Sequence, residues 1–93
     1  MHLVATVLVV AAGAVLGVSH LEWVALVLAI ASVWFAEALN TAFELLCDVT
    51  QPDFHPVVKK AKDVSAGAVL LAAIGAVVIG GLVFGPRILE RLG

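Results

Sequence analysis

Three long apolar stretches constrain this sequence more than any other feature. They cover residues 3–21, 23–47 and 64–85, and the second is broken only by Glu37 and Glu44. At about 1.5 Å of rise per residue, each can cross a hydrocarbon layer of about 30 Å as an α-helix. No stretch alternates with a period of two, which favours helices over a barrel. We therefore predict an all-α fold, in which residues 1–93 form one integral-membrane domain of three transmembrane helices.

The overall composition agrees with a membrane protein. Of the 93 residues, 63% are hydrophobic and 13% are charged, which lies outside the usual range for soluble domains. The sequence shows no basic stripe that would indicate nucleic-acid binding. The single cysteine, Cys47, cannot form an intrachain disulfide, and we expect it to fill space near a helix end.

The distribution of positive charge predicts the orientation in the membrane. The turn at residues 19–23 has no Lys or Arg, whereas the connection at residues 49–62 has three lysines. The positive-inside rule therefore places the lysine-rich connection in the cytoplasm. Arg87 and Arg91, after the third stretch, argue weakly for the opposite orientation. The lysines are Lys59, Lys60 and Lys62.

Prolines predict where the helices end. Pro52 should end the second helix, and Pro56 suits the first turn of the third helix, with Asp53 or His55 as its cap. The third helix should stop at residues 85–86, where a glycine is followed by a proline.

One face of the second helix carries a polar stripe. At about 100° per residue, Glu37, Asn40, Thr41, Glu44 and Asp48 fall within about 100° of arc. An ionised carboxylate facing lipid costs several kcal/mol, so such groups turn inward and often mark a functional site. The rise from Glu37 to Glu44 is about 10 Å, which places Glu44 nearer the cytoplasm and Glu37 deeper.

This arrangement suits phosphoryl transfer from a soluble polyanion to a lipid. Glu44 can hold Mg²⁺ together with phosphates, the three lysines can neutralise phosphate charge, and Glu37 can accept a proton from a lipid hydroxyl. Two other interpretations stay open: the stripe could only hold helices together, or it could translocate protons or ions. His55 could equally be an ordinary surface residue, and Asp63 could simply begin the third span.

A longer motif crosses two helices and a loop. The pattern E-x-L-N-[ST]-A-x-E-x-x-x-D is followed by a loop histidine and by A-K-D. It resembles the small prokaryotic lipid kinases, which comprise three-span diacylglycerol kinases and the related undecaprenol kinases. The segment "KDVSAGAVL" is similar to sequences of the undecaprenol kinase branch. The matching residues are Glu37, Leu39, Asn40, Thr41, Ala42, Glu44, Asp48, His55, Ala61, Lys62 and Asp63.

The resemblance implies a homotrimer in the bacterial inner membrane, with active sites at protomer contacts that use Mg²⁺ and ATP on the cytoplasmic side. It implies that Glu37 is the general base, that Asn40 and Ala66 lie with Glu37 at the lipid site, and that Glu44 binds both the metal and ATP. The other implied nucleotide-binding residues are Asp53, Phe54, His55, Lys62 and Asp63.

The start of the sequence departs from the family pattern. The family carries an amphipathic surface helix before its first span, and that region supplies a second acidic metal ligand. Here the first apolar stretch begins at Leu3, and no acid precedes Glu22. The intact motif still leads us to expect a lipid kinase acting on undecaprenol or diacylglycerol. The alternative is a non-catalytic, kinase-derived membrane subunit that serves a larger complex with other membrane subunits.

Overall fold

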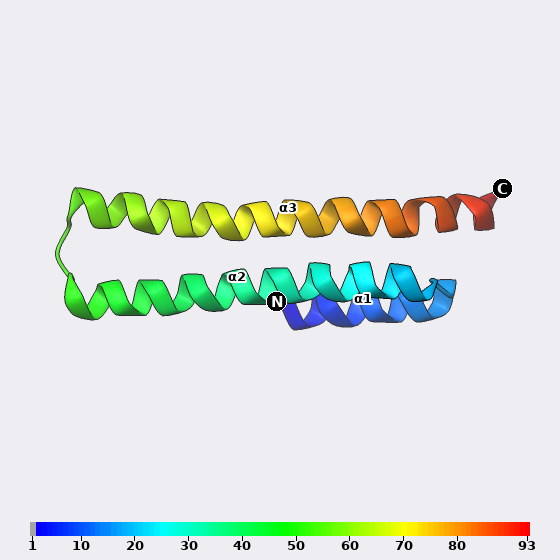
Figure 1. The fold of residues 1–93 in the computed structure, drawn as a ribbon, viewed down its shortest axis with the longest axis horizontal. Coiled ribbons are helices and arrows are strands. Elements are labelled where there is room, and N and C mark those ends of the chain that lie inside the picture. The colour runs from blue at the N-terminus through cyan, green and yellow to red at the C-terminus, as the bar shows by residue number, and fades with distance from the viewer. Residues whose placement is uncertain (1) are drawn as a thin grey trace.

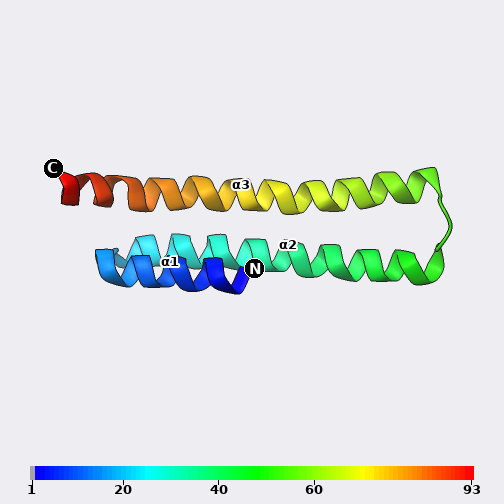
Figure 2. The ribbon, with the colours of Figure 1, turned by 180° about the vertical axis from the view of Figure 1, so that it is seen from behind.

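The computed structural model describes residues 2–93, and these form three helices and two short connections: α1 (His2–Leu16), α2 (His20–Thr50) and α3 (Pro56–Leu92). The predicted all-α fold is confirmed. The chain is a rod of 57 × 20 × 18 Å, in which α2 and α3 run antiparallel along its length (Figure 1). Seen from behind, α1 again lies along only one half of α2 (Figure 2). We call the end with residues 51–55 the loop end and the end with residues 17–19 the turn end.

A glycine and a capping box form the turn between α1 and α2. Gly17 has a φ of +67°, which favours glycine, and the amides of Gly17 and Val18 both donate to the Gly13 carbonyl. Ser19 and Glu22 then cap α2 reciprocally, side chain to backbone. The S-x-x-E signal in the sequence therefore starts α2 earlier than expected. As a result, α1 ends at Leu16 and does not reach residue 21.

The loop end follows the prediction closely. The helix α2 closes with the Gln51 amide bonded to the Cys47 carbonyl at 2.8 Å, and Pro52 follows. His55 is the N-cap of α3, with its Nδ1 accepting from the Val57 amide at 3.2 Å. Of the two predicted caps, His55 is therefore the one used.

The predicted stop of the third helix at residues 85–86 is wrong, because α3 continues through Pro86 to Leu92. Pro86 disfavours the helical conformation of the residue before it through clashes with that residue's backbone N–H and its Cβ. Gly85 has no Cβ, so the second of these clashes is absent. A contact with the end of α1 then holds the last turns of α3, since Arg91 donates to the Val15 carbonyl at 3.2 Å.

A partly buried ion pair closes the turn end. The Arg87 guanidinium donates to both Glu22 carboxylate oxygens, with Nε at 3.0 and 3.2 Å and Nη2 closer still. Both side chains are only partly exposed, at 28% and 25%. These bonds, together with the Ser19 backbone amide, lower the pKa of Glu22 to about 2. Two residues that are far apart in the sequence therefore connect α2 with α3.

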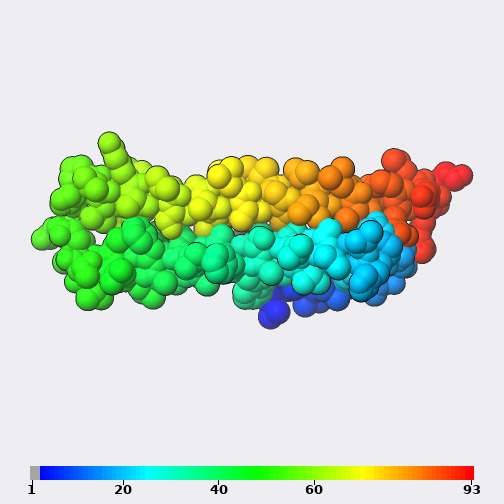
Figure 3. All heavy atoms as spheres, viewed as in Figure 1, coloured from blue at the N-terminus to red at the C-terminus, as the bar shows by residue number. Residues whose placement is uncertain are grey.

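Little of the apolar surface is buried within one chain. A small cluster of Val18, Leu26 and Val83 forms at the turn end, and Cys47 is buried near the other end of α2, as predicted. Most large apolar side chains are exposed, and the space-filling view shows α2 and α3 as one continuous slab (Figure 3).

The exposed apolar helices suit a lipid environment. The most apolar segments of α2 and α3 have mean hydropathies of 1.7 and 2.5, and only 11% and 6% of them is buried. By length and composition both helices can span a membrane. The helix α1 is apolar but has 15 residues, fewer than the roughly 20 that a span needs.

Candidate active site

The polar stripe lies on the face of α2 that α1 covers only at the turn end. Ile30 lines a hollow against α1, and Glu37 and Glu44 follow it at intervals of seven residues. Trp34 donates to Thr6 of α1 at 3.0 Å, and Thr41 follows it after seven residues on the same face. Because α1 begins near mid-length (Figure 1), the half of this face nearer the loop end has no α1 over it.

Burial decreases along the stripe toward the loop end. Glu37 and Asn40 are half-buried, whereas Thr41, Glu44 and Asp48 are exposed. Glu44 lies nearer the loop end than Glu37, and their depths in the membrane stay a prediction.

Two hydrogen bonds link this part of α2 to α3. The Ser65 hydroxyl donates to Asn40 Oδ1 at 2.7 Å, and Lys62 Nζ donates to Asp48 Oδ1 at 3.2 Å. Both bonds fix the rotation of α2 relative to α3 beside the carboxylates. Ser65 was not among the predicted site residues. Its signal was weak, since Ser65 is one of several small residues that begin the third apolar stretch.

A cavity of about 400 Å³ at the loop end gathers most of the residues predicted to bind the nucleotide. Asp53, Phe54, His55 and Lys62 all line it, although they come from the loop and from α3. Lys62 also connects it to the stripe through Asp48. The other lining residues are Gln51, Pro52, Val58 and Lys59.

The electrostatics of this loop cavity favour an anion. Lys59 and Lys62 line it, whereas Lys60, which is exposed, does not. The first turn of α3 has no acidic residue, so nothing there offsets the partial positive charge at the start of the helix. Asp53 is the acidic residue among those lining the cavity.

Glu44 and Asp63, also predicted to bind the nucleotide, do not line the loop cavity. Asp63 accepts a hydrogen bond from Lys59 Nζ at 3.1 Å on the surface of α3. Among the side chains that the structure describes, no three from His, Cys, Asp or Glu converge on a point that could hold a metal ion. The exposed carboxylate of Glu44 nevertheless suits Mg²⁺, which proteins typically hold with one or two carboxylates and the phosphates of a substrate.

The predicted lipid-binding residues are not all together. Asn40 lies beside Glu37 on α2, but Ala66 is exposed on α3 and lines none of the hollows described here. A groove of about 480 Å³ passes its neighbour Ser65. Its α2 residues, Leu39 and Phe43, lie about 100° or more around the helix from the carboxylates. The groove therefore opens on a different side of α2 from the three carboxylates of the stripe. Its lining residues are Leu39, Phe43, Ala61, Val64 and Ser65.

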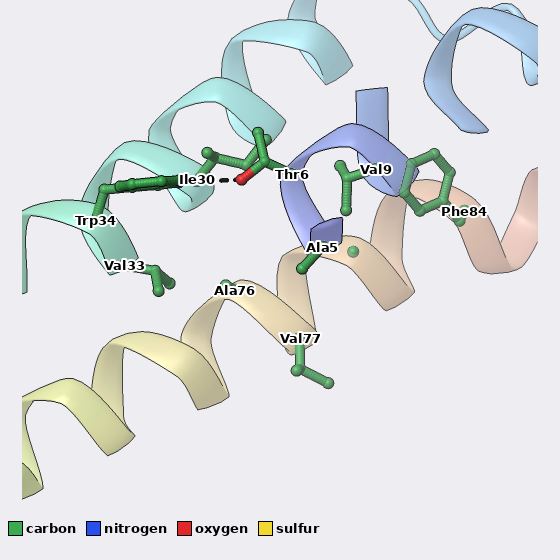
Figure 4. Close-up of a pocket in the computed structure, with 10 residues that line it drawn as sticks. Ala5, Thr6, Val9, Ile30, Val33, Trp34, Ala76, Val77 and Phe84 are labelled. Atoms are coloured by element: carbon green, nitrogen blue, oxygen red, sulfur yellow. Dashed lines mark hydrogen bonds between the residues drawn. The ribbon is translucent and has the colours of Figure 1, made fainter. Parts of the chain in front are cut away.

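A third hollow, of about 270 Å³, lies between all three helices, toward the middle of the rod, where α1 begins. Figure 4 shows apolar side chains around it, with the Thr6–Trp34 hydrogen bond at one side. Small residues on α1 and α3, such as Ala5 and Ala76, leave this space open. It offers hydrocarbon contacts and no ionisable group.

Comparison with known proteins identifies the family. Residues 1–84 match the family described as prokaryotic diacylglycerol kinase. The undecaprenol kinase of Bacillus subtilis is 37% identical over 87 residues, which cover 94% of this chain and 71% of that protein. The diacylglycerol kinase of Synechocystis is 48% identical over 77 residues, which cover 78% of this chain and 44% of that protein.

A more distant relative, the diacylglycerol kinase of Helicobacter pylori, is 39% identical over 54 residues, covering 58% of this chain and 42% of that protein. The chain thus spans less than half the length of these two diacylglycerol kinases. No solved structure matches the chain. The match over most of the chain, and the relative from Bacillus subtilis, show that the chain belongs to the prokaryotic diacylglycerol kinase family, a family of membrane lipid kinases and therefore of phosphotransferases.

Proposed function

We propose that this chain transfers the γ-phosphate of ATP, with Mg²⁺, to the hydroxyl of a membrane lipid, undecaprenol or diacylglycerol. One observation carries the proposal: the loop cavity brings Asp53, Phe54, His55 and Lys62 together directly beyond the polar stripe. A polyanion bound by the lysines there has its reactive end directed along a stripe of carboxylates toward lipid.

Glu37 acts as the general base in this reaction. Its carboxylate takes the proton of the lipid hydroxyl as the oxygen forms a bond to the γ-phosphorus. The bond between that phosphorus and the β–γ bridging oxygen breaks, and ADP leaves. The half-buried position of Glu37 suits contact with a headgroup at the membrane surface. Asn40, and Ala66 on α3, contribute to lipid binding in this proposal.

The remaining polar residues neutralise charge and position the phosphates. Glu44 would hold Mg²⁺, which supplies charge neutralisation at the phosphates when it is bound. Lys62 binds the nucleotide from the loop cavity, and its bond to Asp48 keeps it beside the stripe. Asp63 binds the nucleotide from the adjoining surface of α3.

The orientation and assembly belong to the same proposal. The loop end faces the cytoplasm from the bacterial inner membrane, because its three lysines favour that side and ATP is available there. The exposed carboxylates of Glu44 and Asp48 are covered in a homotrimer, where a second copy completes the site.

The direct test is phosphate transfer by the purified chain. We expect Mg²⁺-dependent transfer of labelled γ-phosphate from ATP to undecaprenol or to diacylglycerol in mixed micelles. Glu37→Gln should reduce kcat by about 100-fold or more, the range for loss of general base catalysis. Glu90→Gln, the same change at an exposed position near the chain end, should leave kcat unchanged.

The opposite outcome has a definite meaning. A folded chain that transfers no phosphate to either lipid would contradict catalysis by these residues alone. It would favour a non-catalytic membrane subunit, whose copurifying partners could then be identified. Equal activity of the Glu37→Gln and Glu90→Gln variants would keep the kinase and exclude Glu37 as its base.

A further inference from the structure

We propose that Lys59 is a second phosphate-binding residue of the loop cavity, and that Asp63 holds it until the phosphates of the nucleotide displace the carboxylate. This inference rests on the proposed function, because it assumes a nucleoside triphosphate in the loop cavity. It adds to the nucleotide site an exchange in which Lys59 leaves the Asp63 carboxylate and binds phosphate.

The geometry places Lys59 between two competing anions. Its side chain lines the loop cavity, and its Nζ donates to Asp63 Oδ2 at 3.1 Å. Asp63 does not line the cavity, so the pair joins the cavity to the outer surface of α3. Lys62 lies one helical turn further on the same face, and its Nζ is bonded to Asp48 in the same way. Each lysine of the cavity is therefore held by one carboxylate.

The Lys59–Asp63 pair is the weaker of the two. Its side chains are 63% and 68% exposed, whereas Lys62 is only 35% exposed in its pair with Asp48. Exposed pairs gain little because water screens them. The order of the charges adds to this weakness, since an acid placed before a base at i, i+4 suits the helix dipole better than the reverse.

A triphosphate is a stronger partner for Lys59 than one carboxylate. It offers several charged oxygens to a lysine that already lines the same cavity, and charge-assisted hydrogen bonds of this kind are among the stronger ones. Once Lys59 turns to the phosphates, the Asp63 carboxylate is released. It can then accept hydrogen bonds from the ribose hydroxyls of the nucleotide. Phosphate binding and ribose binding are thereby coupled through one side-chain movement.

Lys60 provides a matched control. It is adjacent in sequence, carries the same charge and is exposed, but it does not line the loop cavity. A general electrostatic attraction would depend on Lys59 and Lys60 equally. The proposed exchange depends on Lys59 alone.

The experiment measures binding by the purified full chain in micelles, by calorimetry with ATP and with inorganic tripolyphosphate. Lys59→Ala should weaken tripolyphosphate binding about tenfold, as expected for one hydrogen bond between charged groups. Lys60→Ala should weaken it less than about twofold. Asp63→Asn should tighten tripolyphosphate binding, because it releases Lys59, and should weaken the preference for ATP over tripolyphosphate.

A double-mutant cycle separates the exchange from long-range charge effects. If Asp63 acts through Lys59, the gain from Asp63→Asn disappears in the Lys59→Ala background. If the gain persists there, or if Lys59→Ala and Lys60→Ala weaken binding equally, the exchange is overturned although the nucleotide site stands. If the unaltered chain binds neither ATP nor tripolyphosphate, the nucleotide site of the proposed function fails, and this inference fails with it.

Discussion

Single residues at the turn end make interactions that their local sequence does not predict. Glu22 caps its own helix through Ser19 and also accepts hydrogen bonds from Arg87 of α3. The sequence motif predicts the first interaction, because S-x-x-E is a local signal. The second depends on the register of two helices that are 65 residues apart at these positions, which no local pattern encodes.

This ion pair predicts an acid-dependent stability. The folded-state pKa of Glu22 is about 2, below its ordinary value of 4.5, so its contribution is fully present above pH 4.5 and is lost as the pH falls through 2. We expect the unaltered chain in detergent to melt at a higher temperature than Glu22→Gln at pH 6. The difference should shrink below pH 4.5 and vanish near pH 2. A melting difference that stayed constant across this range would contradict a role for the ionised carboxylate.

At the scale of the elements, local signals predicted the existence of all three helices and failed at two of their ends. The Pro52–Pro56 segment places the loop correctly, since proline removes a backbone donor and fixes φ. The end of α1 depends on Gly17 and the capping box, which stop the helix inside an apolar run. Pro86 does not stop α3, because Gly85 relieves the Cβ clash and Arg87 and Arg91 bond to the other helices.

The candidate site shows the same division between local and long-range information. Asp53, Phe54 and His55 are neighbours in sequence, so their convergence in the loop cavity could be predicted from the motif. The Asn40–Ser65 and Asp48–Lys62 bonds could not. Both need the packing of α2 on α3.

The Asn40–Ser65 bond predicts a measurable link between α2 and α3. Removing the hydroxyl in Ser65→Ala should lower the free energy of unfolding by about 0.6–1 kcal/mol, the usual value for such a bond between membrane helices. Ser32→Ala is a matched control, because the Ser32 hydroxyl bonds only to the Leu28 carbonyl of its own helix. Equal unfolding free energies for the two variants, measured in the same micelles, would show that the link adds nothing.

At the scale of the whole molecule, a single chain leaves exposed surfaces that need a particular environment or a partner. Its apolar sides require hydrocarbon, and the exposed half of the polar stripe requires water, a nucleotide or another protein chain. A rod 57 Å long exceeds a hydrocarbon core of about 30 Å, so the loop end can extend beyond it. The loop cavity and the carboxylates of Glu44 and Asp48 would then lie where soluble polyanions have access.

The orientation of this rod in the membrane gives the last prediction. We expect the loop end inside the cell, because its three lysines outnumber the two arginines at the turn end. Arg87 there is already paired with Glu22. In a Cys47→Ser background, a cysteine at His20 should react with a membrane-impermeant maleimide on intact spheroplasts. A cysteine at Gln51 should react only after the membrane is permeabilised. The reverse pattern would place the loop cavity outside, away from cytoplasmic ATP, and would contradict the proposed reaction even if the fold and the family are unchanged.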